Sequence, residues 1–260
     1  MHLLARRVLF RQTQRLGERI FADLGVRTDH FVMDISRAFD RLLQLSAPEF
    51  EYPRSDLAPN TAFIGPFPPS EPPIALPEWW EDLDGDRPVA HVTQGTADNH
   101  DLTRLIRPAL LALEGLDVLV VVSLGGRPPS ALGPVPANAR VASFLPYGRL
   151  LPRTDVVVTN GGYGGVQQAL RQGVPLVVAG DTEDKPEVAA RVAWSGAGVD
   201  LRTGRPDPDA IREAVRRVLA DPEPRRNARR IAASIARLDT VDLLERELAT
   251  VRPRTVRTAS

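Results

Sequence analysis

Residues 156 to 192 read VVVTNGGYGGVQQALRQGVPLVVAGDTEDKPEVAARV, and this stretch is the strongest indication of the fold in the sequence. An apolar, β-branched run at 156 to 158 is typical of a buried parallel strand. A glycine-rich turn at 160 to 165 then leads into a helical pattern, a second apolar strand and an acidic turn that opens another helix. Strand, turn, helix and strand in this order predict a βαβ unit.

The glycine-rich turn has the composition of an anion-binding loop. Glycines carry no Cβ atom, so backbone N–H groups at the start of a helix can close on an anion that the helix dipole favours. A tight turn that serves packing alone is the alternative. The dinucleotide pattern G-x-G-x-x-G, begun at Gly162, meets Gly164 but then Gln167, and the lysine of the G-x-x-x-x-G-K-[ST] loop is absent. Both of these motifs are excluded.

Strand and helix patterns alternate through the rest of the chain after a proline-rich stretch. This alternation predicts an α/β fold with a doubly wound parallel sheet. In such sheets ligands bind beyond the carboxyl ends of the strands, where we expect the loops 93 to 96, 160 to 165 and 181 to 185 to converge. The candidate strands are residues 88 to 93, 117 to 123, 139 to 144, 155 to 159, 175 to 179 and 198 to 201.

Two motifs within residues 156 to 192 resemble the donor-sugar half of the GT-B glycosyltransferases, especially the bacterial family that decorates natural products such as macrolides. The family's H-G-G-x-G-T corresponds to NGGYGG at 160 to 165, and its D-Q-P-x-N-A corresponds to DKPEVA at 184 to 189. The resemblance extends from about residue 45 to 238. It implies a GT-B C-terminal Rossmann-like domain that binds a UDP- or TDP-linked sugar as donor substrate, with no cofactor and no metal.

The resemblance also implies the residues that bind the donor. The family's histidine, threonine and glutamate are replaced by Asn160, Gly165 and Gln168. Loss of a neutral hydrogen bond costs about 1 kcal/mol, so we expect these changes either to weaken donor binding or to alter the choice of donor, without abolishing binding. Phe144 is expected either against the nucleobase or in the core. The implied donor-binding set is Gln94, Gly95, Thr96, Phe144, Asn160, Gly161, Gly162, Gly164, Gly165, Gln168, Asp184 and Lys185.

Lys185 is the only lysine in the chain and stands where the family has glutamine. A compact ammonium group with three donors can reach a hydroxyl or phosphate oxygen of the donor. An ion pair with Glu183 or Glu187 is the alternative, and the sequence does not separate the two.

Composition excludes several classes of protein. With 260 residues, 43% of them hydrophobic, the chain can bury a core, and 33 basic against 33 acidic residues give no footprint of a nucleic-acid binder. The absence of cysteine excludes disulfides and thiolate metal sites and fits a cytoplasmic protein. The four histidines form no metal-binding pattern, and the lack of an 18-residue apolar span argues against membrane insertion.

We expect two domains. Residues 1 to 76 would be a helical remnant of an acceptor-binding domain followed by a proline-rich linker, and residues 77 to 260 would be the donor-nucleotide domain. Apolar residues at helical spacing within residues 1 to 26 predict an amphipathic helix that needs a partner surface. Such a remnant leaves no room for an acceptor domain, so the catalytic residues, including a general base, stay unknown.

Two functions follow. The first is half of a hexosyltransferase that moves a sugar from a nucleotide-diphosphate donor to a small molecule, with the acceptor domain on a separate chain or missing. The second is a non-catalytic module that binds a nucleotide or nucleotide sugar, or that stabilises a partner. A nucleotide-sugar epimerase ranks third, because the carboxylate and histidine set it needs is not found. An apolar face left by a missing domain also predicts self-association.

Overall fold

The structure is a computed structural model that describes residues 4–26, 29–69 and 74–251. The chain forms two compact units. The larger comprises Leu45–Pro53 and Gly65–Thr240, and the smaller comprises Met1–Gln44, Arg54–Ile64 and Val241–Ser260. The predicted boundary near residue 76 stays a prediction.

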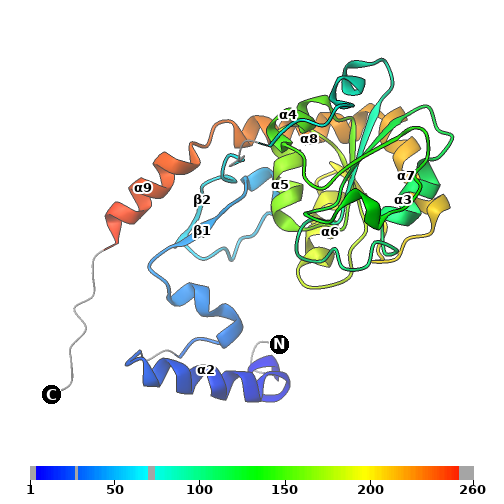
Figure 1. The fold of residues 1–260 in the computed structure, drawn as a ribbon. Coiled ribbons are helices and arrows are strands. Elements are labelled where there is room, and N and C mark those ends of the chain that lie inside the picture. The colour runs from blue at the N-terminus through cyan, green and yellow to red at the C-terminus, as the bar shows by residue number, and fades with distance from the viewer. Residues whose placement is uncertain (1–3, 27–28, 70–73, 252–260) are drawn as a thin grey trace. The chain divides into compact units, whose positions relative to one another are not determined.

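A six-stranded parallel sheet forms the centre of the larger unit (Figure 1). Its strand order is β5-β4-β3-β6-β7-β8, so the direction of winding reverses between β3 and β6. Ligands bind at this kind of reversal in doubly wound sheets. All six predicted strands and the predicted fold class are confirmed. The strands are β3 (Val89–Thr93), β4 (Leu119–Ser123), β5 (Ala139–Ala142), β6 (Val156–Thr159), β7 (Leu176–Val178) and β8 (Gly198–Asp200).

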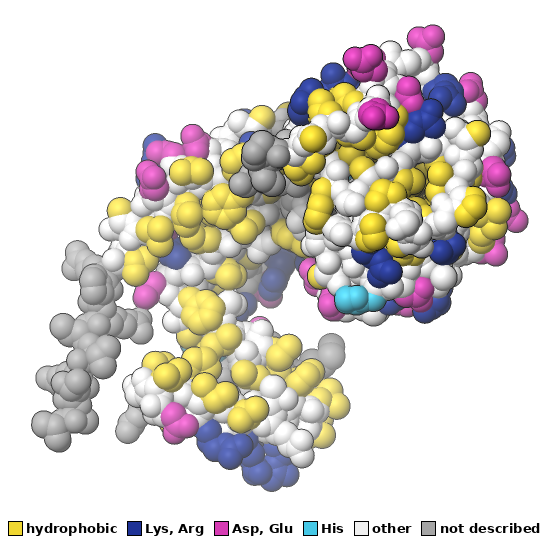
Figure 2. Space-filling model, in the orientation of Figure 1, with side chains coloured by type: hydrophobic (Ala, Val, Ile, Leu, Met, Phe, Trp, Pro, Cys, Tyr) yellow, Lys and Arg dark blue, Asp and Glu magenta, His cyan; other side chains and the backbone are white. Residues whose placement is uncertain are grey.

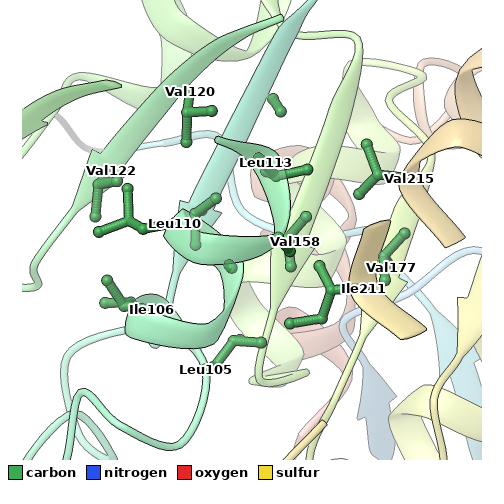
Figure 3. Packing of buried hydrophobic residues seen from close by; sticks show 14 of the residues in the cluster. Leu105, Ile106, Leu110, Leu113, Val120, Val122, Val158, Val177, Ile211 and Val215 are labelled. Atoms are coloured by element: carbon green, nitrogen blue, oxygen red, sulfur yellow. The ribbon is translucent and has the colours of Figure 1, made fainter. Parts of the chain in front are cut away.

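Helices cover both faces of this sheet. On one face α3 (Ile106–Leu113) and α7 (Pro208–Ala220) bury leucine, isoleucine and valine side chains against the strands, as Figure 3 shows. The other face carries α5 (Tyr163–Arg171), α6 (Lys185–Trp194) and α8 (Pro222–Ile235). Since β3, β4 and β6 are buried along their whole length, their sequences are apolar without alternation.

Short elements complete the larger unit. They are η3 (Pro48–Phe50), η4 (Trp80–Asp84), η5 (Pro129–Ala131), α4 (Tyr147–Leu150) and η6 (Leu151–Arg153). In η4 the Trp80 side chain is buried against Leu119 and Val121, and this contact fastens the segment after the proline-rich linker to the sheet. Within the proline-rich linker, residues 70–73 lie outside the described residues.

The smaller unit is largely helical. The predicted N-terminal helix is confirmed over the described residues as η1 (Ala5–Leu9) and α2 (Arg11–Asp23), and η2 (Val32–Ala38) follows. A short parallel pair, β1 (Leu42–Gln44) and β2 (Thr61–Phe63), was not expected from the sequence, and neither was α9 (Thr240–Thr250). Along α2 and at its C-cap, the side chains of Leu16, Ile20 and Leu24 recur every fourth residue and are all exposed. Figure 2 shows hydrophobic side chains on the surface of this segment.

Candidate functional site

Three hydroxyl side chains stand in register at the carboxyl ends of neighbouring strands. Thr93, the last residue of β3, pairs with Ser123 of β4 on one side and with Thr159 of β6 on the other. A cavity of about 210 Å³ lies at this edge of the sheet, beside the reversal of strand order. Its lining residues are Thr93, Gly95, Thr96, Ser123, Gly125, Phe144, Leu145, Tyr147, Thr159, Asn160, Gly162 and Gly165.

The cavity brings together half of the residues predicted to bind the donor. These are Gly95, Thr96, Phe144, Asn160, Gly162 and Gly165. Sequence reasoning missed the other lining residues, although a hydroxyl at the end of each central strand was a readable signal. Phe144 is 48% exposed, so its side chain lines the cavity and is not part of the hydrophobic core.

The glycine-rich turn contains two kinds of glycine. Gly161 has φ +85°, and a Cβ atom there would lie 2.7 Å from Cγ1 of Val178, so this glycine is needed for the turn itself. Its N–H already donates to the Thr159 hydroxyl at 3.3 Å. Gly164 and Gly165 are exposed, and apart from neighbouring backbone of α5 itself no atom lies within 4 Å of a Cβ built on either.

The open space over Gly164 and Gly165 coincides with the start of α5. This nine-residue helix has no side-chain cap at its N-cap, Gly162, and no acidic residue in its first turn. The first N–H groups of a helix have no partner inside the helix, and the positive end of its dipole favours an anion. Of the predicted anion-binding loop, the first turn of α5 is therefore the part that remains a candidate for binding an anion.

Two amide side chains in the predicted set hold the loops together. Asn160 is buried and donates from Nδ2 to the carbonyl oxygens of Gln94 at 2.7 Å and Asp98 at 3.4 Å. Gln94 donates from Nε2 to the Asp101 carbonyl at 3.0 Å and accepts from the Ile106 N–H, at the start of α3, at 3.1 Å. Both amide groups thus bind protein atoms and fix the loop that follows β3.

A second glycine pair, which the sequence reasoning missed, lies after β4. Gly125 has φ +59°, and a Cβ atom there would lie 2.0 Å from the carbonyl oxygen of Gly95. A Cβ at Gly126 would lie 3.0 Å from the Phe144 ring. Asn99 donates to the Leu124 carbonyl at 3.0 Å. The loops after β3 and β4 therefore touch backbone to backbone, which leaves no room for a side chain between them.

Lys185 forms a clamp between two loops. Its side chain is almost fully buried, and Nζ lies 3.3 Å from Oδ2 of Asp98, 3.2 Å from the Thr182 hydroxyl and in contact with Glu183. The ion pair with Glu183, one of the two alternatives that the sequence left open for Lys185, is present, whereas Glu187 pairs with Arg191 at 2.9 Å. A contact of Lys185 with the donor stays a prediction.

The charges around the clamp are mutually stabilising. Burial raises the pKa of Asp98, but hydrogen bonds from Thr182 and Lys185, together with the charges of Lys185 and Arg104, outweigh it and hold the pKa below its usual value. Burial opposes protonation of Lys185, yet Glu183 and Asp98 raise its pKa. Both groups stay ionised near neutral pH.

The remaining predicted residues do not line the 210 Å³ cavity. Asp184 is exposed at the N-cap of α6, where its side chain makes no capping hydrogen bond. Gln168, on α5, donates to the Phe67 carbonyl at 3.1 Å. A small pocket lined by Gln94, Asn160 and Lys185, among others, shows that the three predicted loops do converge.

Another cavity, of about 520 Å³, lies at the opposite edge of the sheet. It is rich in arginine, but Arg153, Arg225 and Arg226 are paired with carboxylates. Because doubly wound sheets bind ligands at the carboxyl ends of their strands, the 210 Å³ cavity is the better candidate for a ligand site.

Within the described part of the chain, no group of three or more His, Cys, Asp or Glu side chains is placed to hold a metal ion. No helix among the described residues is long and apolar enough to cross a membrane.

Comparison with known proteins agrees with this geometry. Residues 108–240 match the family described as "Erythromycin biosynthesis protein CIII-like, C-terminal domain". The chain belongs to the GT-B glycosyltransferase family. It is 49% identical over 247 residues to 4'-demethylrebeccamycin synthase of Lentzea aerocolonigenes, an alignment that covers 92% of this chain and 58% of that protein.

Solved structures show the same relationship. The calicheamicin glycosyltransferase CalG4 superposes with a TM-score of 0.70 at 28% identity, covering 92% of this chain and 61% of CalG4. The glycosyltransferase VinC in complex with dTDP superposes with a TM-score of 0.58 at 27% identity, covering 74% of this chain and 52% of VinC. The chain thus spans little more than half the length of these relatives.

Proposed function

We propose that the larger unit binds the nucleoside diphosphate of a nucleotide-sugar donor, and that the protein transfers the sugar, a hexose, to a small-molecule acceptor. The observation that carries this proposal is the uncapped first turn of α5, whose exposed glycines adjoin the cavity at the strand reversal. Family membership supports the same reaction, since a nucleotide-sugar donor is what glycosyltransferases of this type use.

In this proposal each part of the donor has a place. The nucleobase lies against Phe144, and the diphosphate lies at the first turn of α5 within reach of the Thr96 hydroxyl. Asp184, with a carboxylate free of capping bonds, accepts hydrogen bonds from sugar hydroxyls. As the bond to the sugar breaks, charge grows on the leaving diphosphate, and preorganised N–H groups aimed at that charge lower the barrier. Acceptor binding and the general base lie outside this unit.

The nucleotide is a uridine or thymidine diphosphate. VinC, which was crystallised with dTDP, supports the thymidine form. Isothermal titration of the 260-residue chain with UDP, TDP and, as a control, inorganic phosphate tests the assignment. Saturable binding of one nucleoside diphosphate, much tighter than that of phosphate, is expected. Equal binding of all three, or of none, contradicts it.

A second function has one specific observation in its favour. Asn160 occupies the motif position where the family has histidine, and its amide group donates hydrogen bonds to protein carbonyl oxygens. This arrangement suits a non-catalytic module that holds a nucleotide without promoting transfer. Incubation of the chain with UDP- or TDP-hexose and an acceptor-domain partner separates the two functions, because binding without turnover favours the module.

We also infer that the exposed stripe of Leu16, Ile20 and Leu24 is covered in the working protein. An apolar stripe of this kind fits either the acceptor-binding half or a second copy of the chain. Light scattering of the purified chain checks the second option, since a strictly monomeric sample excludes self-association. We place the reaction in the cytoplasm, where a chain without cysteine needs no disulfides.

A further inference from the structure

A fully buried histidine stands in the middle of the central strand β3. His91 has no exposed surface and follows Ala90 and precedes Val92, which are equally buried. Its Nδ1 lies 2.9 Å from the Val121 carbonyl oxygen, and its Nε2 lies 3.0 Å from the hydroxyl of Tyr147. The two rings meet edge to face, with centroids 5.2 Å apart.

The chemistry of the hydrogen-bond partners of His91 fixes which atom donates in each hydrogen bond of this series. A carbonyl oxygen can only accept, so His91 carries its proton on Nδ1 and accepts on Nε2 from the Tyr147 hydroxyl. The Tyr147 oxygen is in turn hydrogen-bonded to the Thr93 hydroxyl, which acts as donor. Thr93 then accepts from the Gly95 N–H at 3.1 Å. Each hydroxyl gives one hydrogen bond and receives one.

The chain of hydrogen bonds runs from the core to the cavity. Tyr147, Thr93 and Gly95 all line the 210 Å³ cavity, whereas His91 does not reach it. Burial lowers the pKa of His91 to about 4, so the ring stays neutral and keeps its acceptor nitrogen above about pH 5. A buried polar side chain is retained at a cost that an apolar residue would avoid.

We propose that His91 is a positioning residue for the nucleotide site, which fixes the Tyr147 and Thr93 hydroxyls and, through them, the loop that begins at Gly95. This inference rests on the proposed function, because the loop it presets is the one that meets the nucleoside diphosphate. A histidine that merely fills the core would need no partner whose other end lies in the cavity. Here the hydrogen bonds continue without a break from Val121 to Gly95.

Two substitutions of His91 separate positioning from core filling. In His91→Gln the amide oxygen can still accept from Tyr147, and in His91→Leu nothing can. Titration calorimetry with UDP and TDP, well below the melting temperature of each variant, measures the consequence. We expect about fivefold weaker binding for His91→Leu, which corresponds to one lost neutral hydrogen bond, and affinity within about twofold of the wild type for His91→Gln.

The outcomes are distinct. A wild-type chain that binds neither nucleotide overturns the proposed function and this inference with it. Wild-type binding together with unchanged affinity in folded His91→Leu overturns the inference alone. Should His91→Leu fail to fold, ¹⁵N spectra of the wild type decide: the Nε2 resonance of His91, that of an unprotonated nitrogen, shifts on adding nucleotide if His91 positions the site. An unmoved resonance contradicts the proposal.

Discussion

Removal of the Lys185 ammonium should loosen two loops at once. In Lys185→Met the aliphatic stem is kept, while Asp98 and Glu183 both lose their contact with the ammonium group. The two pairs are not equivalent. The Asp98 side chain is 28% exposed and lies 3.3 Å from Nζ, whereas the Glu183 side chain is 67% exposed. Solvent screens the second pair far more than the first.

The expected magnitudes follow from this difference. A hydrogen bond between ionised groups with one partner buried contributes about 2 kcal/mol, and an exposed pair contributes below about 0.5 kcal/mol. In Lys185→Met the Asp98 carboxylate keeps its contacts with Thr182 and Arg104. The loss in free energy of unfolding should therefore stay below the roughly 3 to 5 kcal/mol that is lost when one partner of a fully buried ion pair is removed. We expect melting to fall by about 4 to 8 °C.

Double-mutant cycles measured by chemical unfolding give each pair separately. The cycle of Asp98→Asn with Lys185→Met should yield a coupling free energy of about 2 kcal/mol, and the matched cycle of Glu183→Gln with Lys185→Met below about 0.5 kcal/mol. A coupling free energy for Glu183 equal to or above that for Asp98 would contradict this ranking of the two ion pairs.

Acidity provides an independent check of the clamp. The pKa of Asp98 is lowered from its usual 3.8, so its contribution to stability is complete above that value and is lost as the pH falls through the lowered pKa. Since Lys185→Met removes part of this contribution, the variant should lose less stability than the wild type between pH 4 and pH 2, roughly.

Three further predictions concern other parts of the larger unit. Gly161→Ala forces a Cβ into a filled site at positive φ and should cost about 2 to 4 kcal/mol, whereas Gly164→Ala, in open space, should leave the free energy of unfolding within about 1 kcal/mol. Burial lowers the pKa of His91 to about 4, so as the pH falls below about 6.5 the unfolded chain takes up a proton on His91 before the folded chain does. The stability of the fold should therefore decrease from about pH 6.5 to about pH 4, and it should decrease less in His91→Gln. Asp207→Ala removes a cap at 2.8 Å and should cost about 1 kcal/mol, whereas Asp184→Ala removes none and should weaken only donor binding.

Urea unfolding measures the stability of the two glycine variants, of His91→Gln beside the wild type, and of the two aspartate variants. Titration calorimetry measures donor binding by Asp184→Ala. Equal stability of the two glycine variants would show that the turn relaxes. A histidine resonance that titrates near pH 6.5 for His91 would contradict its burial. Loss of stability in Asp184→Ala would make that carboxylate structural.

The sheet could be predicted from the sequence because the strands are buried on both faces. Runs such as 119 to 123, LVVVS, and 156 to 159, VVVT, have no other comfortable place in a small α/β unit. The strand order follows once the glycine turn is placed at the reversal. The short β1 and β2 could not be found, because three residues without alternation give no periodic signal.

The site could be predicted only in part. The glycines at 160 to 165 stand together in one short stretch and are therefore visible in the sequence, whereas Gly125, which follows β4, was missed. The inward orientation of Asn160 and Gln94 depends instead on carbonyl groups supplied by another loop. The same holds for the pairing of Lys185 with Asp98, which joins loops distant in the sequence. Side-chain direction across a fold is not encoded in local spacing.

The first turn of α5 is proposed to hold the diphosphate, and a comparison of two variants at Gly164 that differ only in charge tests this placement. Gly164→Asp and Gly164→Asn add side chains of nearly equal size in open space, and an acidic residue in the first turn favours the helix itself. Titration calorimetry of both variants with UDP and TDP should show at least about tenfold weaker binding for Gly164→Asp than for Gly164→Asn, while Gly164→Asp melts no lower. Equal affinities of the two variants would place the diphosphate elsewhere and contradict the account.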